Sequence, residues 1–182
     1  MMTPKAKHEL RHLTYAAVCL ALALILPLVT GNIPRIGRAL CPMHLPVLLC
    51  GFVAGPWWGL AVGLAAPPLR HLLFAMPPYP TFAAMALELG AYGLVSGLLY
   101  KHLPRRTGYI YLSLLAAMAL GRIVSGAAMA ALLGLGGQSY SFAAFIAANV
   151  TGAVPGLIAQ ILLVPVIVLA LEKAGIAHKH LH

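Results

Sequence analysis

Three ionisable side chains interrupt otherwise apolar stretches of this sequence, namely Arg70, Glu88 and Arg122. Each would cost at least about 2.5 to 3.5 kcal/mol if it faced lipid near the centre of a bilayer, so each must face protein, water or a ligand. Asn149 is a further polar residue in an apolar stretch. Polar groups that converge inside an apolar protein can form the pocket for a polar solute. The alternative is an ion pair, Glu88 with Arg70 or Arg122, that only joins two helices.

The balance of charge bears on these alternatives. One carboxylate cannot neutralise two guanidinium groups, so a site that contains Glu88, Arg70 and Arg122 keeps an excess of positive charge. Such a site would suit a carboxylate-bearing or otherwise anionic solute. Tyr92 follows Glu88 by one helical turn and shares its face, so we expect it either to contact the solute or to pack in the core.

Three other polar residues in apolar surroundings are more typical of structural roles. His44 and His71 lie at the ends of expected helices with no carboxylate nearby in sequence, so we interpret both as structural rather than as proton-transfer groups. Gln160 is expected to hydrogen-bond a neighbouring helix rather than a solute. We expect no metal site and no cofactor, because the sequence contains no ligand spacing typical of either.

The composition identifies the environment in which these residues must lie. Of 182 residues, 62% are hydrophobic and 8% are charged, and the mean hydropathy is +0.93. A soluble domain carries about a quarter charged residues, so this chain is an integral membrane protein. A span needs about 20 residues, which leaves room for five to seven crossings and for no large soluble domain. The formal charge of +9 is divided among short clusters between apolar runs, which indicates membrane topology and excludes nucleic acid as a partner.

Turn-forming residues divide the apolar runs and predict an all-α fold, a single domain of six transmembrane helices. The weakest of these divisions is Gly55-Pro56, which splits one long uncharged run into a short helix and a longer one. The predicted helices cover about residues 13–30, 43–54, 57–75, 81–103, 109–133 and 142–171.

The distribution of Lys and Arg supports six crossings with both termini in the cytoplasm. Short cytoplasmic loops of membrane proteins collect these residues. With six helices the outer side holds only Arg35 and Arg38, whereas a single crossing over residues 39–75 would move most of the basic residues outside. The basic residues that six helices place inside are Lys5, Lys7, Arg11, Lys101, Arg105, Arg106, Lys173 and Lys179.

Two segments of the chain resemble a known family of membrane proteins. The first runs from Pro42 through Phe52 and on to Arg70, followed by Met76-Pro77-Pro78, and the second runs from Ala86 to Tyr100. In these segments, in its six predicted helices and in its small size, the chain is similar to the substrate-binding S components of energy-coupling factor (ECF) transporters. The resemblance covers most of the sequence.

The resemblance implies a protein of the bacterial or archaeal cell membrane that captures a vitamin from outside. It would dock on a transmembrane scaffold subunit driven by two cytoplasmic ABC ATPases, and then tip over to release the vitamin inward. The AxxxA motif that faces the scaffold in this family corresponds to Ala17 and Ala21. The family's pocket, formed by the first outer loop and helices four to six, corresponds to Asn32, Arg35, Glu88, Tyr92, Arg122 and Asn149.

The excess of arginine favours pantothenate as the vitamin, with riboflavin close behind. The chief alternative function is a stand-alone carrier or channel for small solutes. The inner halves of the predicted helices are apolar, which favours access from one side only. We expect no enzymatic activity, because the sequence lacks a phosphate-binding GxxxxGK[ST] loop, an HExxH motif and a nucleophile elbow. ATP hydrolysis would then belong to separate subunits.

Overall fold

The structure, a computed structural model, describes residues 3–29, 41–104, 106–137, 141, 143 and 153–175. Within these residues the chain forms six α-helices and no strand, which confirms the predicted all-α fold and the number of helices. The helices are α1 (Pro4–Val29), α3 (His44–Ala54), α4 (Pro56–Phe74), α5 (Thr81–His102), α6 (Thr107–Leu135) and α8 (Val154–Lys173).

The helices differ in their capacity to cross a bilayer. Four of them, α1, α5, α6 and α8, are long and apolar enough to do so. α4 has 19 residues and a length of about 28 Å, close to the thickness of the hydrocarbon core, but it is less apolar and contains Pro67, Pro68 and Arg70. α3 has only 11 residues and is about 16 Å long, so it reaches about half of that thickness.

Most helix boundaries agree with the sequence prediction, and the first helix is the exception. α1 begins at Pro4 rather than near residue 13, because its polar first turns contain no helix breaker and proline suits a first helical position. Gly55 separates α3 from α4 with a φ of 99°, a conformation that favours glycine, which supports the predicted division at this point. Residue 142 and residues 144–152, where we predicted the first part of the last helix, lie outside the described residues.

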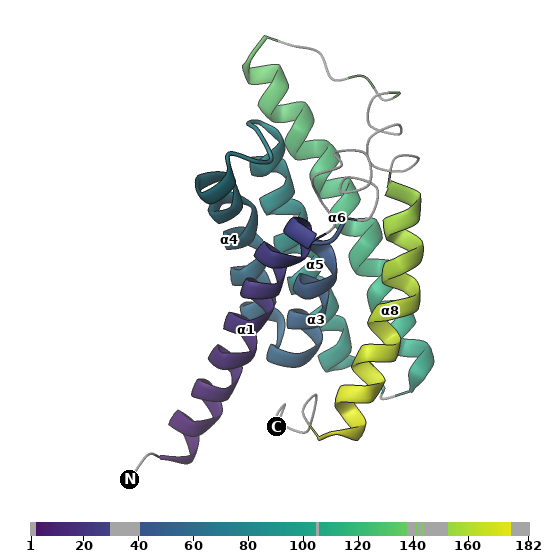
Figure 1. Ribbon diagram of the computed structural model, residues 1–182. Coiled ribbons are helices and arrows are strands. Elements are labelled where there is room, and N and C mark those ends of the chain that lie inside the picture. Colours follow the sequence, from purple (N-terminus) through teal and green to yellow (C-terminus); the bar gives the residue numbers. More distant parts are fainter. Residues whose placement is uncertain are drawn as a thin grey trace.

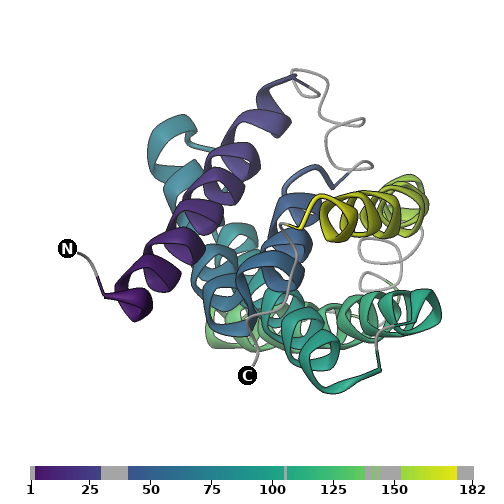
Figure 2. The same cartoon turned by 90° about the horizontal axis from the view of Figure 1, so that it is seen from below.

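The helices surround α3, which packs against α1, α4, α5 and α8. α1 lies along one flank of this group, and α6 and α8 lie on the other (Figure 2). The start of α1 and the end of α8 are at the same end of the bundle, at the bottom of Figure 1. This arrangement agrees with an even number of crossings, while the cytoplasmic location of that end stays a prediction.

Glycines allow α3, α4 and α5 to approach one another closely. A Cβ atom added to Gly93 of α5 would lie 2.3 Å from the backbone carbonyl carbon of Gly59 in α4. A Cβ atom added to Gly63 of α4 would lie 2.3 Å from the carbonyl oxygen of Leu89. A Cβ atom added to Gly51 of α3 would lie 2.5 Å from the carbonyl oxygen of Gly93. Small residues at such helix crossings are a common basis of packing in membrane proteins.

We therefore expect Gly93→Ala to destabilise the bundle by about 1 to 3 kcal/mol or more, since the new methyl group meets backbone atoms that cannot rotate away. Gly134→Ala in α6 is the matched control, because no atom of the described residues lies within 4 Å of the added Cβ and alanine favours helix. Thermal unfolding in detergent measures both variants. Equal melting temperatures would show that the α4–α5 contact is looser than described.

Candidate functional site

The predicted site centres on Glu88, which lies in the middle of α5 and is only 3% exposed. Nη1 of the Arg122 guanidinium in α6 lies 2.9 Å from Oε1 of Glu88 and forms an ion pair with it, and the Arg122 side chain is 13% exposed. A buried carboxylate and a partly buried guanidinium thus neutralise each other across the α5–α6 interface. The ion pair that we considered as a structural alternative is present.

His44 is a third member of the cluster, which sequence reasoning missed. It is the first residue of α3, it is buried, and its Nε2 lies 3.3 Å from Oε1 of Glu88. The sequence places no carboxylate near His44, but the fold supplies one from α5, and the structural role that we expect for His44 stays a prediction. The two residues are 44 positions apart, and only the packing of α3 on α5 brings them together.

Tyr92 packs beside the charged groups, one turn after Glu88 as the helical spacing predicted. Its side chain is fully buried, and its ring meets that of His44 edge-on with the centroids 5.3 Å apart. Gly121 of α6 makes room for the ring, because a Cβ atom there would lie 2.0 Å from it. Arg122 also donates from Nη2 to Sγ of Cys41, at 3.9 Å. Cys41 is a further contact that the sequence did not reveal.

The cluster contains polar atoms whose hydrogen bonds are not made within the described part of the chain. These are Nδ1 of His44, the hydroxyl of Tyr92 and Nε of Arg122, all of them buried. A buried polar group without a partner costs about 1 to 3 kcal/mol. Three such atoms around one ion pair therefore leave room for hydrogen bonds to a polar ligand or to water.

Gln160 of α8 is another buried polar side chain. It is 1% exposed, and neither its amide oxygen nor its amide nitrogen has a hydrogen-bond partner among the described residues. Within those residues the structure does not provide the interhelical hydrogen bond that we predicted for Gln160. Its amide can donate and accept, so it can serve a ligand or a water molecule equally well.

Arg70, near the end of α4, does not join the Glu88 cluster as we predicted. Its Nη1 donates to the carbonyl oxygen of Leu24 in α1, at 3.2 Å, and its guanidinium lies 5.5 Å from the centroid of the Phe74 ring. Arg70 therefore adds no positive charge beside Glu88, and the prediction that two arginines share the site with Glu88 was wrong. His71 has a structural contact, with Nδ1 2.7 Å from the carbonyl oxygen of Pro77.

The AxxxA residues of α1 lie away from the rest of the bundle. Ala17 and Ala21 are exposed, whereas Ala16, Ala23 and Pro27 are buried against the neighbouring helices. One face of α1 therefore packs on α3 and α4, whereas Ala17 and Ala21 belong to its exposed surface.

Three predicted site residues, Asn32, Arg35 and Asn149, lie outside the described residues. In the part of the chain that the structure covers, no group of three or more His, Cys, Asp or Glu side chains is arranged to hold a metal ion.

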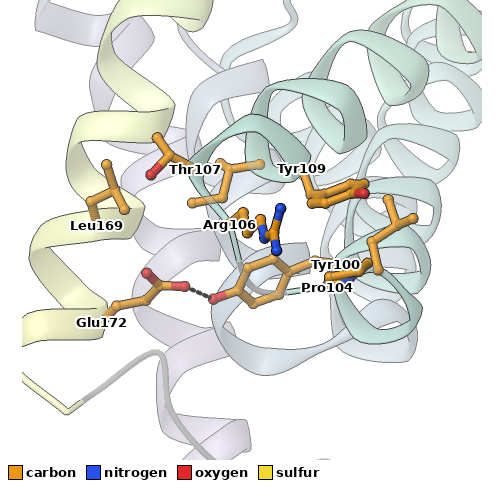
Figure 3. A pocket seen from close by; sticks show the side chains of 9 residues that line it. Tyr100, Pro104, Arg106, Thr107, Tyr109, Leu169 and Glu172 are labelled. Atoms are coloured by element: carbon orange, nitrogen blue, oxygen red, sulfur yellow. Dashed lines mark hydrogen bonds between the residues drawn. The ribbon is translucent and has the colours of Figure 1, made fainter.

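A cavity of about 140 Å³ lies at the opposite end of α5 from Thr81 and shares no residue with the Glu88 cluster (Figure 3). It lies where the connection between α5 and α6 meets the last turns of α8. Its lining residues are Tyr100, Leu103, Pro104, Arg106, Thr107, Tyr109, Ile110, Leu169 and Glu172.

The chain matches one protein family, described as "ECF transporter, substrate-specific component", over residues 11–177. No curated protein and no solved structure matches the chain.

Proposed function

This chain belongs to the family of substrate-specific components of ECF transporters, and on that premise we propose that it binds a vitamin or vitamin precursor from outside the cell. It would then deliver this solute inward after docking on an energising module of one scaffold subunit and two ABC ATPases. The proposal includes residence in the plasma membrane of a bacterium or archaeon.

The observation that supports the binding site is the buried Glu88–Arg122 pair with unpartnered polar atoms around it. A pair with a purely structural role would be expected to leave few such atoms, because each one costs stability. Nε of Arg122 can only donate, and the Tyr92 hydroxyl can donate as well. A ligand with carbonyl or hydroxyl oxygens would accept these hydrogen bonds.

The choice between pantothenate and riboflavin can no longer be made from charge. Pantothenate was favoured because two arginines were expected beside one glutamate, but Arg70 binds the backbone of α1. Arg122 and Glu88 balance each other, so their pair carries no net charge. Both vitamins contain the acceptor oxygens that the free donors require, and we retain both as candidates.

The exposed face of α1 supports the docking part of the proposal. Ala17 and Ala21 are small, apolar and exposed, so a scaffold helix could approach the backbone closely there. The same face gives a stand-alone carrier no advantage, which is why we prefer a subunit that works with partners.

The test is mass spectrometry of small molecules that copurify with the full chain, followed by binding measurements with pantothenate and riboflavin. We expect one vitamin-sized molecule per protein and tight binding of the same compound. The binding proposal fails if no such molecule copurifies and neither compound, nor any other vitamin tested, binds. Uptake into vesicles that contain only this chain would support the stand-alone carrier instead.

A further inference from the structure

The cavity of Figure 3, where α5 ends and α6 begins, is lined by two kinds of residue. Arg106, Thr107 and Glu172 provide charged and polar groups, and Leu103, Ile110 and Leu169 provide apolar ones. Tyr100 and Tyr109, which also line the cavity, are the amphipathic aromatic residues that membrane proteins place at the boundary between lipid and water. Such a mixed lining suits an amphiphile better than a purely polar solute.

Two opposite charges line this cavity without meeting each other. No ion pair joins Arg106 to Glu172 in the described part of the chain, although both face the same space (Figure 3). The Tyr100 hydroxyl donates a hydrogen bond to Oε1 of Glu172 and holds that carboxylate in place. A carboxylate has several lone pairs, so Glu172 can still accept hydrogen bonds from a ligand.

The separated charges define the chemistry of a ligand. A guanidinium binds a phosphate through two parallel hydrogen bonds, and a carboxylate accepts hydrogen bonds from an ammonium group. A cavity of about 140 Å³ is close to the size that holds a benzene molecule, which suits a phosphate with a short substituent. The ligand is thus a small zwitterion with an apolar remainder.

We propose that this cavity binds the phosphoethanolamine headgroup of a phospholipid, with the phosphate on Arg106 and the ammonium on Glu172. The start of the acyl region then lies along Ile110 and Leu169. Pockets between transmembrane helices that contain a basic residue, as this one contains Arg106, are recurrent lipid sites.

The experiment is native mass spectrometry of the full chain mixed with equal amounts of phosphatidylethanolamine and phosphatidylcholine. Both lipids carry the phosphate, but choline has no N–H group to donate to Glu172. We expect the wild-type protein to retain phosphatidylethanolamine about fivefold more than phosphatidylcholine. Arg106→Gln should lower retention of both lipids about fivefold, and Glu172→Gln should remove the preference between them.

Lys101→Gln is the matched control, because it removes one exposed positive charge from the same end of the bundle but outside the cavity lining. It should bind lipid like the wild type. Glutamine at position 172 keeps an acceptor for Tyr100, and melting temperatures measured alongside report on folding.

Three results would overturn the proposal. One is equal retention of the two lipids by the wild-type protein, and another is an equal loss in Lys101→Gln and Arg106→Gln, which would indicate diffuse charge attraction. The third is displacement of the lipid by the same concentration of inorganic phosphate, which would indicate a site for free phosphate.

Discussion

Replacing Arg122 with alanine should lower the free energy of unfolding by about 3 to 5 kcal/mol, because the change leaves the Glu88 carboxylate buried without its partner. Nε2 of His44, 3.3 Å from the same oxygen, remains beside the carboxylate in this variant. Thermal or chemical unfolding in detergent measures the loss. A stability equal to that of the wild type would mean that the pair is solvated or readily replaced.

A second variant separates the structural role of the pair from its role in binding. Glu88→Leu combined with Arg122→Met removes both charges at once, and such replacements of buried pairs are often neutral or stabilising. We expect the double variant to recover most of the stability lost in Arg122→Ala. If the pair contacts the vitamin, binding should nevertheless fall about tenfold or more, because charged hydrogen bonds to the ligand are lost. Recovery of both stability and affinity would show that the pair only joins α5 to α6.

Tryptophan at Ala17 or Ala21 should reduce vitamin uptake about tenfold or more while binding to the isolated subunit is unchanged. The large side chain keeps a scaffold helix away from the α1 backbone, and close approach is the basis of such small-residue contacts. Both positions are exposed and lie at least about 100° around α1 from the buried Ala16 and Ala23, so the fold can accommodate the change. Uptake with the energising subunits and affinity without them are the two measurements.

Leu22→Trp is the control for this experiment. Leu22 is also exposed on α1, but it lies about 100° around the helix from Ala21, toward a different direction. We expect this variant to take up vitamin like the wild type. Normal uptake by both alanine variants, or an equal block by Leu22→Trp, would remove Ala17 and Ala21 from the docking face.

The sequence predicted the elements well because the signals for them are local. Long uncharged runs, Gly55-Pro56 and the prolines after residue 76 delimit helices without reference to the rest of the fold. The sequence indicated that Glu88 could pair with an arginine, either Arg70 or Arg122, because charge inside a membrane protein requires a partner. The start of α1 was harder to predict, because a polar sequence without a helix breaker is compatible with either a loop or a helix.

The composition of the site depended on how the helices are rotated and packed, which the sequence did not encode locally. Arg70 and Arg122 have the same chemistry, yet one binds the Leu24 carbonyl and the other binds Glu88. His44 joined the cluster only because glycines such as Gly51 bring α3 against α5. The spacing of small residues could have indicated that α3 and α5 approach each other closely. It could not have indicated which polar side chain of α3 would then lie beside Glu88.

The shortness of α3 has a consequence for the biosynthesis of the protein. A segment of 11 residues covers about half of the hydrocarbon core, so α3 cannot remain in the bilayer by itself as the chain leaves the ribosome. It must enter together with α4, as a hairpin folded at Gly55. Its buried polar residue, His44, is then shielded from lipid only after α5 has been synthesised and has supplied Glu88. Membrane insertion of this region is therefore cooperative across three helices rather than sequential.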